Sequence, residues 1–319
     1  MSNSLTLSGV HHVTAITAKA ALNHAFYTRT IGMRLVKKTV NQDDVSAYHL
    51  FYADRKGTPG TDLTFFDWPA APERRGTDSI VRTGLRVPGE ESVEWWRARL
   101  DEQGVKRSEA EYRDGRWTLD FEDSEGQRLS FVEDSNPGEA EPWENSPVPP
   151  EHQIRGLGPI TISVGDLAPT DLILTNLLNM RRVREWVYPG TGVEVHVYSM
   201  GEGGPSSELQ VAVEPGSSVA RQGAGGVHHV AFRAPTFEQH EAWNRRLDDF
   251  RIPSNGPVDR FYFRSLYFRE PSGILFELAT DGPGFSLDEP RENLGESLAL
   301  PPFLESRRKE IEANLKPLE

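Results

Sequence analysis

The chain has 319 residues, and its 48 acidic against 35 basic side chains give a formal net charge of −13. This balance argues against nucleic acid or an anionic membrane as a partner, because both require a basic surface. There is no cysteine, which excludes zinc ribbons, iron–sulfur clusters and disulfides. No apolar run approaches the roughly 20 residues of a membrane span, and no secretory signal opens the chain. We therefore expect a cytoplasmic protein that acts on small molecules.

Hydrophobic periodicity divides the chain into four units of about 55 to 65 residues, each with a strand, one amphipathic helix and further alternating strands. The first unit begins with a strand at Gly9–Thr17 and a helix near Ala20–Gly32. Its later strands are expected at Arg34–Val40, Ser46–Ala53 and Asp62–Trp68. The second unit has its first strand at Ser79–Val87, its helix at Glu91–Gln103 and its last strand at Arg128–Glu133.

A proline-rich segment separates the two halves of the chain. Asp134–Gln153 carries five prolines among polar residues, and such a segment cannot pair in a sheet. We predict an N-terminal domain at residues 1–135, a linker at 136–153, a C-terminal domain at 154–282 and a surface tail at 283–319. The third unit covers Gly156–Pro215 with a helix near Pro169–Met180, and the fourth covers Gly226–Asp281 with a helix at Phe237–Asp249.

The first and fourth units begin with the same pentapeptide, Gly-Val-His-His-Val, at residues 9–13 and 226–230. The last strand of the fourth unit contains Glu277. Two imidazoles and one carboxylate suit a first-row divalent metal and leave adjacent coordination positions open, as in non-heme Fe(II) oxygenases. A structural zinc site would be closed. The repeat therefore predicts a mononuclear catalytic metal site.

Strand parity selects one histidine from each pair, because neighbouring side chains on a strand point to opposite faces. His12 shares its face with Thr14, whereas His228 shares its face with apolar residues that we expect to pack on the helices. We predict His12, His229 and Glu277 as the metal ligands. His24 and His240 are interpreted as helix-surface residues, and His49, His152 and His196 fit no metal-binding pattern.

Four βαβββ units resemble the vicinal-oxygen-chelate superfamily, which includes glyoxalases, bleomycin resistance proteins and extradiol dioxygenases. The chain is most similar to its hydroquinone 1,2-dioxygenase group. The motifs that carry this resemblance are His11-His12, Tyr48-His49-Leu50, Gly57–Thr61, Thr64-Phe65-Phe66, His228-His229, Arg260, Tyr267, Pro271-Ser272-Gly273 and Glu277. The resemblance implies an α+β fold with two curled-sheet barrels, in which the first and fourth units face each other across the metal. It selects the same three ligands.

The resemblance also implies the chemistry, which is cleavage of a hydroquinone-type ring by O2 at Fe(II), with Mn(II) as the alternative metal. Coordination of a phenolic hydroxyl to the metal lowers its pKa. His11 or His228 is the expected acid or base, Arg260 anchors a substrate oxygen, and Tyr267 donates to oxygen or substrate. Thr14 is expected in the pocket wall. The partners are then a small aromatic molecule and O2, and a homo-oligomer is a base-rate expectation.

Other functions stay open at this point. A glyoxalase-like lyase or isomerase acting on a thiol adduct would use Zn or Ni with a fourth protein ligand. The first-unit position equivalent to Glu277 falls near Thr64–Phe66, where there is neither carboxylate nor imidazole, so an open site is favoured. A catechol-cleaving extradiol dioxygenase and a non-catalytic binding module are the remaining alternatives. Phe65, Phe66 and Trp68 are predicted to be core residues.

Overall fold

The computed structural model describes residues 5–136 and 138–318. The first unit consists of β1 (Val10–Thr17), α1 (Ala20–Ala25), the π-helical turn η1 (Phe26–Thr30), β2 (Arg34–Val40), β3 (Tyr48–Ala53) and β4 (Asp62–Asp67). The second consists of β5 (Ser79–Val87), α2 (Gly89–Glu102), β6 (Glu111–Arg113), β7 (Arg116–Glu122) and β8 (Arg128–Glu133). A 3-10 turn, η2 (Pro150–His152), lies in the connection to the second half.

The second half repeats this order. The third unit consists of β9 (Leu157–Val164), α3 (Leu167–Leu172), η3 (Ile173–Leu177), β10 (Arg181–Val187), β11 (Glu194–Ser199), η4 (Pro205–Ser207) and β12 (Glu208–Val213). The fourth consists of β13 (Val227–Arg233), α4 (Phe237–Asp249), β14 (Ser254–Asp259), β15 (Phe263–Arg269) and β16 (Leu275–Pro283). The tail contains η5 (Phe285–Leu287), η6 (Arg291–Asn293), η7 (Pro302–Arg307) and α5 (Arg308–Asn314).

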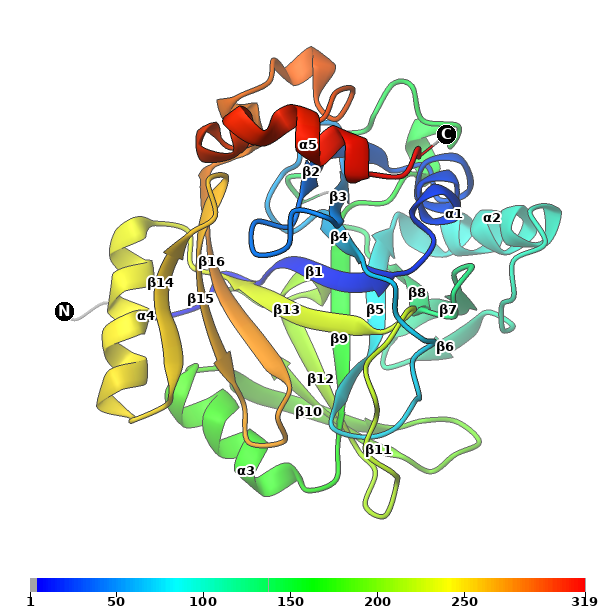
Figure 1. The fold of residues 1–319 in the computed structure, drawn as a ribbon. Helices are drawn as coiled ribbons and strands as arrows, with labels where there is room; N and C mark the ends of the chain where they lie inside the picture. Colours follow the sequence, from blue (N-terminus) through cyan, green and yellow to red (C-terminus); the bar gives the residue numbers. More distant parts are fainter. Residues whose placement is uncertain (1–4, 137, 319) are drawn as a thin grey trace.

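Two eight-stranded sheets are formed, and each joins one unit from either half of the chain (Figure 1). The first sheet has the order β14-β15-β16-β13-β1-β4-β3-β2 and combines the fourth and first units. The second has the order β10-β11-β12-β9-β5-β8-β7-β6 and combines the third and second. The predicted α+β fold, with the first and fourth units facing each other, is confirmed. The domain boundaries at 136–153 stay a prediction.

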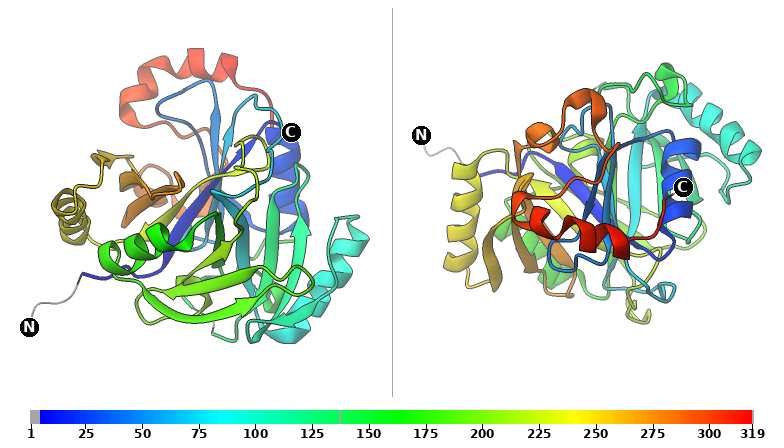
Figure 2. Two further views of the ribbon diagram at one scale, coloured as in Figure 1. Left: turned by 90° about the horizontal axis from the view of Figure 1, so that it is seen from below. Right: turned by 45° about the horizontal axis from the view of Figure 1, so that its top comes forward.

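The seam between the first and fourth units is an antiparallel pair, β1 with β13, in which Thr14 lies opposite His229. On the outer sides of this seam β1 pairs in parallel with β4, and β13 pairs in parallel with β16. Both sheets curl, as two further views show (Figure 2). The inner surface of the first sheet is therefore lined by the two units that are farthest apart in sequence.

Helices cover the outer faces of the sheets and contribute apolar side chains to the core. In α4 a capping box formed by Thr236 and Gln239 begins the helix, and Trp243 and Leu247 are fully buried against the sheet. His240 was expected on the helix surface, and this expectation is wrong. It is completely buried, and its Nε2 lies 3.2 Å from the carbonyl oxygen of Leu278.

The tail packs over β2 and β3, with α5 above them in Figure 1. Phe285 contacts the ring of Phe51, and Leu304 and Ile311 pack on Val40. Lys37 of β2 is buried and forms ion pairs with Asp288 and Glu289 of the tail. None of the helices among the described residues is long and apolar enough to cross a membrane.

Candidate metal centre

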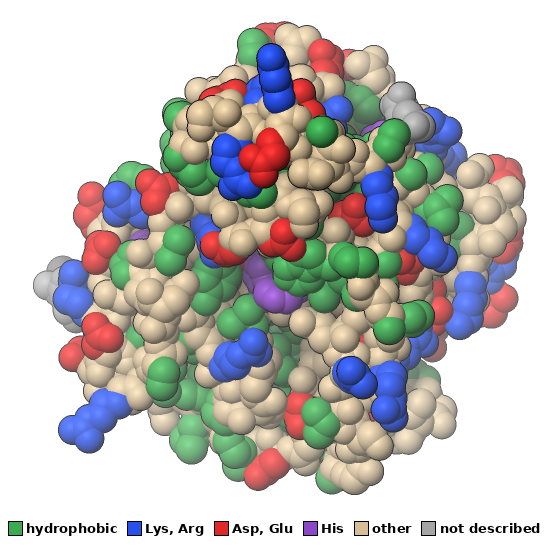
Figure 3. Space-filling model, viewed as in Figure 1, with side chains coloured by type: hydrophobic (Ala, Val, Ile, Leu, Met, Phe, Trp, Pro, Cys, Tyr) green, Lys and Arg blue, Asp and Glu red, His purple; other side chains and the backbone are tan. Residues whose placement is uncertain are grey.

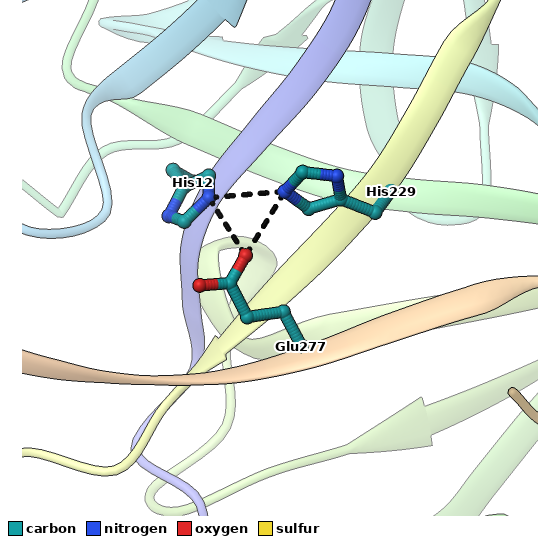
Figure 4. Close-up of side chains that lie close together, drawn as sticks. All are labelled: His12, His229 and Glu277. Carbon is teal, nitrogen blue, oxygen red and sulfur yellow. Dashed lines mark hydrogen bonds and ion pairs between the residues drawn. The ribbon is translucent and has the colours of Figure 1, made fainter. Parts of the chain in front are cut away.

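His12, His229 and Glu277 converge on one point at the inner surface of the first sheet (Figure 4). The Nε2 atoms of the two histidines are 3.4 Å apart. Glu277 Oε2 lies 3.1 Å from His12 Nε2 and 2.9 Å from His229 Nε2. All three side chains are buried, with exposed fractions of 3%, 3% and 0%. They come from the neighbouring strands β1, β13 and β16.

The three donor atoms fit a divalent metal. Atoms bonded to one metal at about 2.1 Å and at right angles to one another would be about 3 Å apart. Neither carboxylate oxygen of Glu277 accepts a well-directed hydrogen bond from a described residue, although both oxygens are buried. Burial opposes its ionisation, but His12 and His229 hold the pKa of Glu277 well below its ordinary value. An ionised carboxylate that lacks directed donors, beside two ring nitrogens, is a metal-binding arrangement.

In each histidine pair the residue that is not a ligand orients the ligand. His11 Nε2 lies 3.1 Å from the carbonyl oxygen of Thr280, and its Nδ1 lies 3.0 Å from His12 Nδ1. Because a carbonyl only accepts, His11 Nε2 carries the proton and its Nδ1 accepts from His12 Nδ1. The lone pair of His12 Nε2 is then directed to the centre, as a ligand requires. His228 repeats the contact, with its Nδ1 2.7 Å from His229 Nδ1.

Burial keeps both of these orienting imidazoles neutral. It lowers the pKa of His11 to about 3, with a further contribution from His12. It also lowers the pKa of His228 to about 3, with a further contribution from His229. Neither residue lines the cavity in front of the ligands. His228 instead borders a separate hollow beside Glu73 and Arg269.

A cavity opens in front of the ligand atoms. Figure 3 shows histidine at the bottom of a hollow in this face of the molecule. Besides the two ligand histidines, the cavity is lined by Thr14, Thr39, Val40, Asn41, Gln42, Asp43, His49, Phe51, Phe66, Arg260, Tyr262, Phe263 and Tyr267.

Arg260 and Tyr267 form one side of this cavity, together with Asp43. Arg260 is paired with the Asp43 carboxylate at 3.0 Å, and its guanidinium lies 5.7 Å from the centre of the Tyr267 ring. Gln42 donates to the backbone oxygen of Arg260 at 2.8 Å. The Asp43–Arg260 pair thereby links the 41–47 loop of the first unit to the fourth unit across the cavity.

Comparison with known proteins places this architecture in a family. The model described as "Glyoxalase/Bleomycin resistance protein/Dioxygenase superfamily" matches residues 9–131 and 156–278. The chain belongs to this superfamily. It is 46% identical to the "Putative ring-cleaving dioxygenase MhqA" of Bacillus subtilis over 99% of this chain and 100% of that protein. It is 31% identical to the "Chlorohydroquinone/hydroquinone 1,2-dioxygenase" of Sphingobium indicum over 96% and 95%.

Solved structures agree with this membership. A crystal structure described as a "putative dioxygenase" from Bacillus subtilis superimposes with a TM-score of 0.90 at 35% identity and covers 99% of both chains. Glyoxalase I from Zea mays has a TM-score of 0.63 at 14% identity, covering 86% of this chain and 92% of that one. The second similarity concerns the superfamily fold alone.

The structure brings most of the predicted site residues together and adds further residues to the cavity. The predicted ligands His12, His229 and Glu277 lie within contact of one another, and Thr14, Arg260 and Tyr267 line the cavity. Several cavity residues were missed, among them Phe66 and His49. Phe66 was predicted to be core, but it faces the cavity, whereas Phe65 is in the core as expected.

His49 is another missed residue. It is a lone histidine in the otherwise apolar strand β3, and it faces the cavity beside Phe51, with which it shares strand parity. Burial lowers its pKa well below the ordinary value, and His12 and His229 lower it further. The alternation of His49 with Leu50 was the signal that could have placed it on the inner face.

The matching surface of the second sheet holds ion pairs instead of a ligand set of this kind. Arg184 pairs with Asp114 at 2.6 Å and with Glu208 at 2.8 Å, and Arg116 also pairs with Glu208. Among the described residues one further group of potential ligands occurs, Glu185, Glu194 and His196, on β10 and β11. Arg182 lies 2.6 Å from its His196 Nδ1, which opposes a cation there.

Proposed function

We propose that this superfamily member is an Fe(II)-dependent ring-cleaving dioxygenase that acts on a hydroquinone-type aromatic. The observation that carries the proposal is the open ligand set, two histidines and one glutamate, facing a cavity with several aromatic walls. Two imidazoles and one carboxylate with free adjacent positions are the arrangement used by non-heme Fe(II) oxygenases. The names of the relatives over nearly the full chain support the same reaction class.

The position that could supply a fourth protein ligand distinguishes this site from the site of a glyoxalase-like lyase. In the parallel pairs, Glu277 lies opposite Ala231 and Thr64 lies opposite Thr14. Because Ala231 and Thr14 each follow a ligand histidine by two residues, Thr64 is the first-unit equivalent of Glu277. It offers a hydroxyl where a four-ligand site would have a carboxylate. This supports the dioxygenase over the glyoxalase-like alternative on a thiol adduct.

Bound iron would make a coordinated phenolic hydroxyl more acidic and would activate O2 beside it. The protein's own groups position the substrate. Phe51, Phe66 and Phe263 enclose the ring and exclude water. Arg260 supplies positive charge toward a substrate oxygen. Its pairing with Asp43 holds the guanidinium at the cavity wall.

Tyr267 is the proposed hydrogen-bond donor. Burial, reinforced by the nearby Glu277, raises the pKa of Tyr267 above its ordinary value, so the phenol stays protonated. Its ring lies 5.6 Å from that of His229. His11 and His228 lie behind the ligands and bind them through Nδ1. We therefore assign these two histidines to orienting the ligands, in place of the acid–base role suggested by the sequence.

Isotope labelling tests the proposal. The protein is loaded with Fe(II) under anaerobic conditions, mixed with hydroquinone and exposed to ¹⁸O2, and the product is analysed by mass spectrometry. We expect a ring-opened product carrying both labelled atoms. Glu277→Ala should form none, whereas Glu194→Ala, at an exposed site, should behave as the wild type. Product from catechol alone would retain the reaction class and overturn the substrate, and absence of label would refute the proposal.

A further inference from the structure

His49 is held rigidly in the cavity wall. Its ring packs against two phenylalanine rings, with centroid distances of 4.0 Å to Phe51 and 4.5 Å to Phe66. Its Nε2 lies 3.0 Å from Thr64 Oγ1. The ring orientation is therefore fixed by packing against both phenylalanine rings and by one hydrogen bond.

The contact with Thr64 connects His49 to β1, the strand that carries His12. Thr64 Oγ1 lies 2.8 Å from Thr14 Oγ1, and Thr14 follows the ligand His12 by two residues on β1. The hydrogen-bonded chain His49–Thr64–Thr14 thus crosses β3, β4 and β1. In the fourth unit the equivalent of Thr64 is a metal ligand. In the first unit the same position connects to an imidazole.

The other nitrogen of His49 is available to a ligand. Nδ1 has no hydrogen-bond partner among the described residues, and His49 lines the cavity. Thr39 lies directly opposite His49 on β2. Its hydroxyl is buried and makes no well-directed hydrogen bond with a described residue, although it interacts with the Tyr262 hydroxyl, which itself donates to Asp288 at 2.8 Å. A buried polar atom without a partner loses the hydrogen bonds that it makes in water.

These two groups come from strands that lie further along the sheet than the strands of the metal ligands. The ligands come from β1, β13 and β16, whereas His49 and Thr39 come from β3 and β2, with β4 between them and β1. Neighbouring strands are about 4.8 Å apart, and the sheet curls around the cavity. A substrate ring with hydroxyls at opposite ends matches a site whose polar groups lie at opposite ends. A catechol carries both hydroxyls at one end.

We propose that His49 and Thr39 form a subsite that binds the ring hydroxyl opposite the metal-bound hydroxyl, and that this subsite selects para-diols. The inference rests on the proposed function, since it assumes a phenolic ligand at the metal. His49 Nδ1 and Thr39 Oγ1 are the atoms that contact the distal hydroxyl. His49 is thereby a specificity residue for the reaction.

Anaerobic calorimetry of the Fe(II)-loaded protein with hydroquinone and with phenol tests the subsite, because phenol lacks only the distal hydroxyl. We expect the wild type to bind hydroquinone about 10-fold more tightly than phenol. His49→Phe keeps an aromatic ring at this position. It should lower the affinity ratio toward one, because it weakens the binding of hydroquinone and leaves the binding of phenol nearly unchanged. Thr39→Val should lower it by a smaller factor. His152→Phe, at a histidine stacked on Trp95 outside the cavity, is the matched control.

Metal content and far-UV circular dichroism are measured on each variant to confirm folding and loading. A ratio that stays unchanged in both His49→Phe and Thr39→Val would overturn the subsite, even if the enzyme consumes oxygen. A fall of the ratio in a protein that forms no ring-opened product would retain the subsite and refute the proposed reaction. The binding assay therefore tests the subsite, and the labelling assay tests the reaction, each independently of the other.

Discussion

Thr64 and Glu277 occupy equivalent positions in the first and fourth units, each beside the strand that carries a ligand histidine. Glu277 points its carboxylate at the centre, whereas the Thr64 hydroxyl bonds to Thr14 and His49. The two halves of the site thus have the same arrangement of strands and differ in the side-chain group at this one position. Among the residues that the structure describes, this difference leaves one side of the centre without a further carboxylate or imidazole.

Thr64→Glu should close the site. A second carboxylate at this position would add a fourth protein ligand, so the protein should still bind one metal per chain but lose at least about 10-fold in oxygen consumption. Thr64→Gln is the control, with the same shape and no charge. Metal analysis and oxygen uptake are the measurements. Full activity in Thr64→Glu would show that this position does not face the open side.

His11→Ala should weaken metal binding by about 10- to 100-fold, because it removes the acceptor that orients His12. Competition with a chelator gives the affinity. His11→Asn should restore part of it, since the amide oxygen can take the place of Nδ1 as the acceptor. Equal affinities for the alanine and asparagine variants would contradict an orienting role.

Buried His240 should make the protein less stable in acid. Burial lowers its pKa below 6.5 in the folded state, so between the two pKa values the unfolded chain binds the extra proton. The stabilisation is present above about pH 6.5 and is lost as the pH falls below it. His240→Gln, which keeps a donor for Leu278, should lose less free energy of unfolding between pH 7.5 and pH 5 than the wild type. Urea titrations with chelator present measure this, and equal losses would refute it.

The buried amine of Lys37 should be essential for docking the tail. Lys37→Met leaves the Asp288 and Glu289 carboxylates without their cation, and removing one partner of a buried pair costs about 3 kcal/mol or more. Lys309→Met, at an exposed residue of α5, should change the free energy of unfolding by less than about 0.5 kcal/mol. Chemical denaturation checks both variants. Similar small effects would show that the tail docks through its apolar residues alone.

The convergence of His12, His229 and Glu277 could be predicted from sequence because strand parity is local. His12 and His229 were distinguished from His11 and His228 by their neighbours alone. Strand parity could have placed His49 on the inner face but could not have assigned its contacts, which depend on the register of β3 with β4 and β1. A local signal existed for His240, which falls at helical spacing with the buried Trp243 and Leu247 of α4. Its polar character was given too much weight.

The prediction of the cavity residues was limited in the same way, because it depended on how distant strands are arranged. Phe66 shares strand parity with Thr64, and this parity places both on the inner face. The prediction assigned it to the core because aromatic side chains at a strand end usually pack there. Only the arrangement of the two units around one centre shows which face of β4 is hollow.

Oxygen uptake by the Fe(II)-loaded protein is the most direct test of the central claim that His12, His229 and Glu277 hold iron for ring cleavage. Hydroquinone, methylhydroquinone and catechol are compared in the wild type and in Glu277→Ala. The account predicts uptake of one O2 per hydroquinone consumed, and loss of uptake in the variant. No uptake with any of the three substrates, with one iron bound per chain, would contradict it.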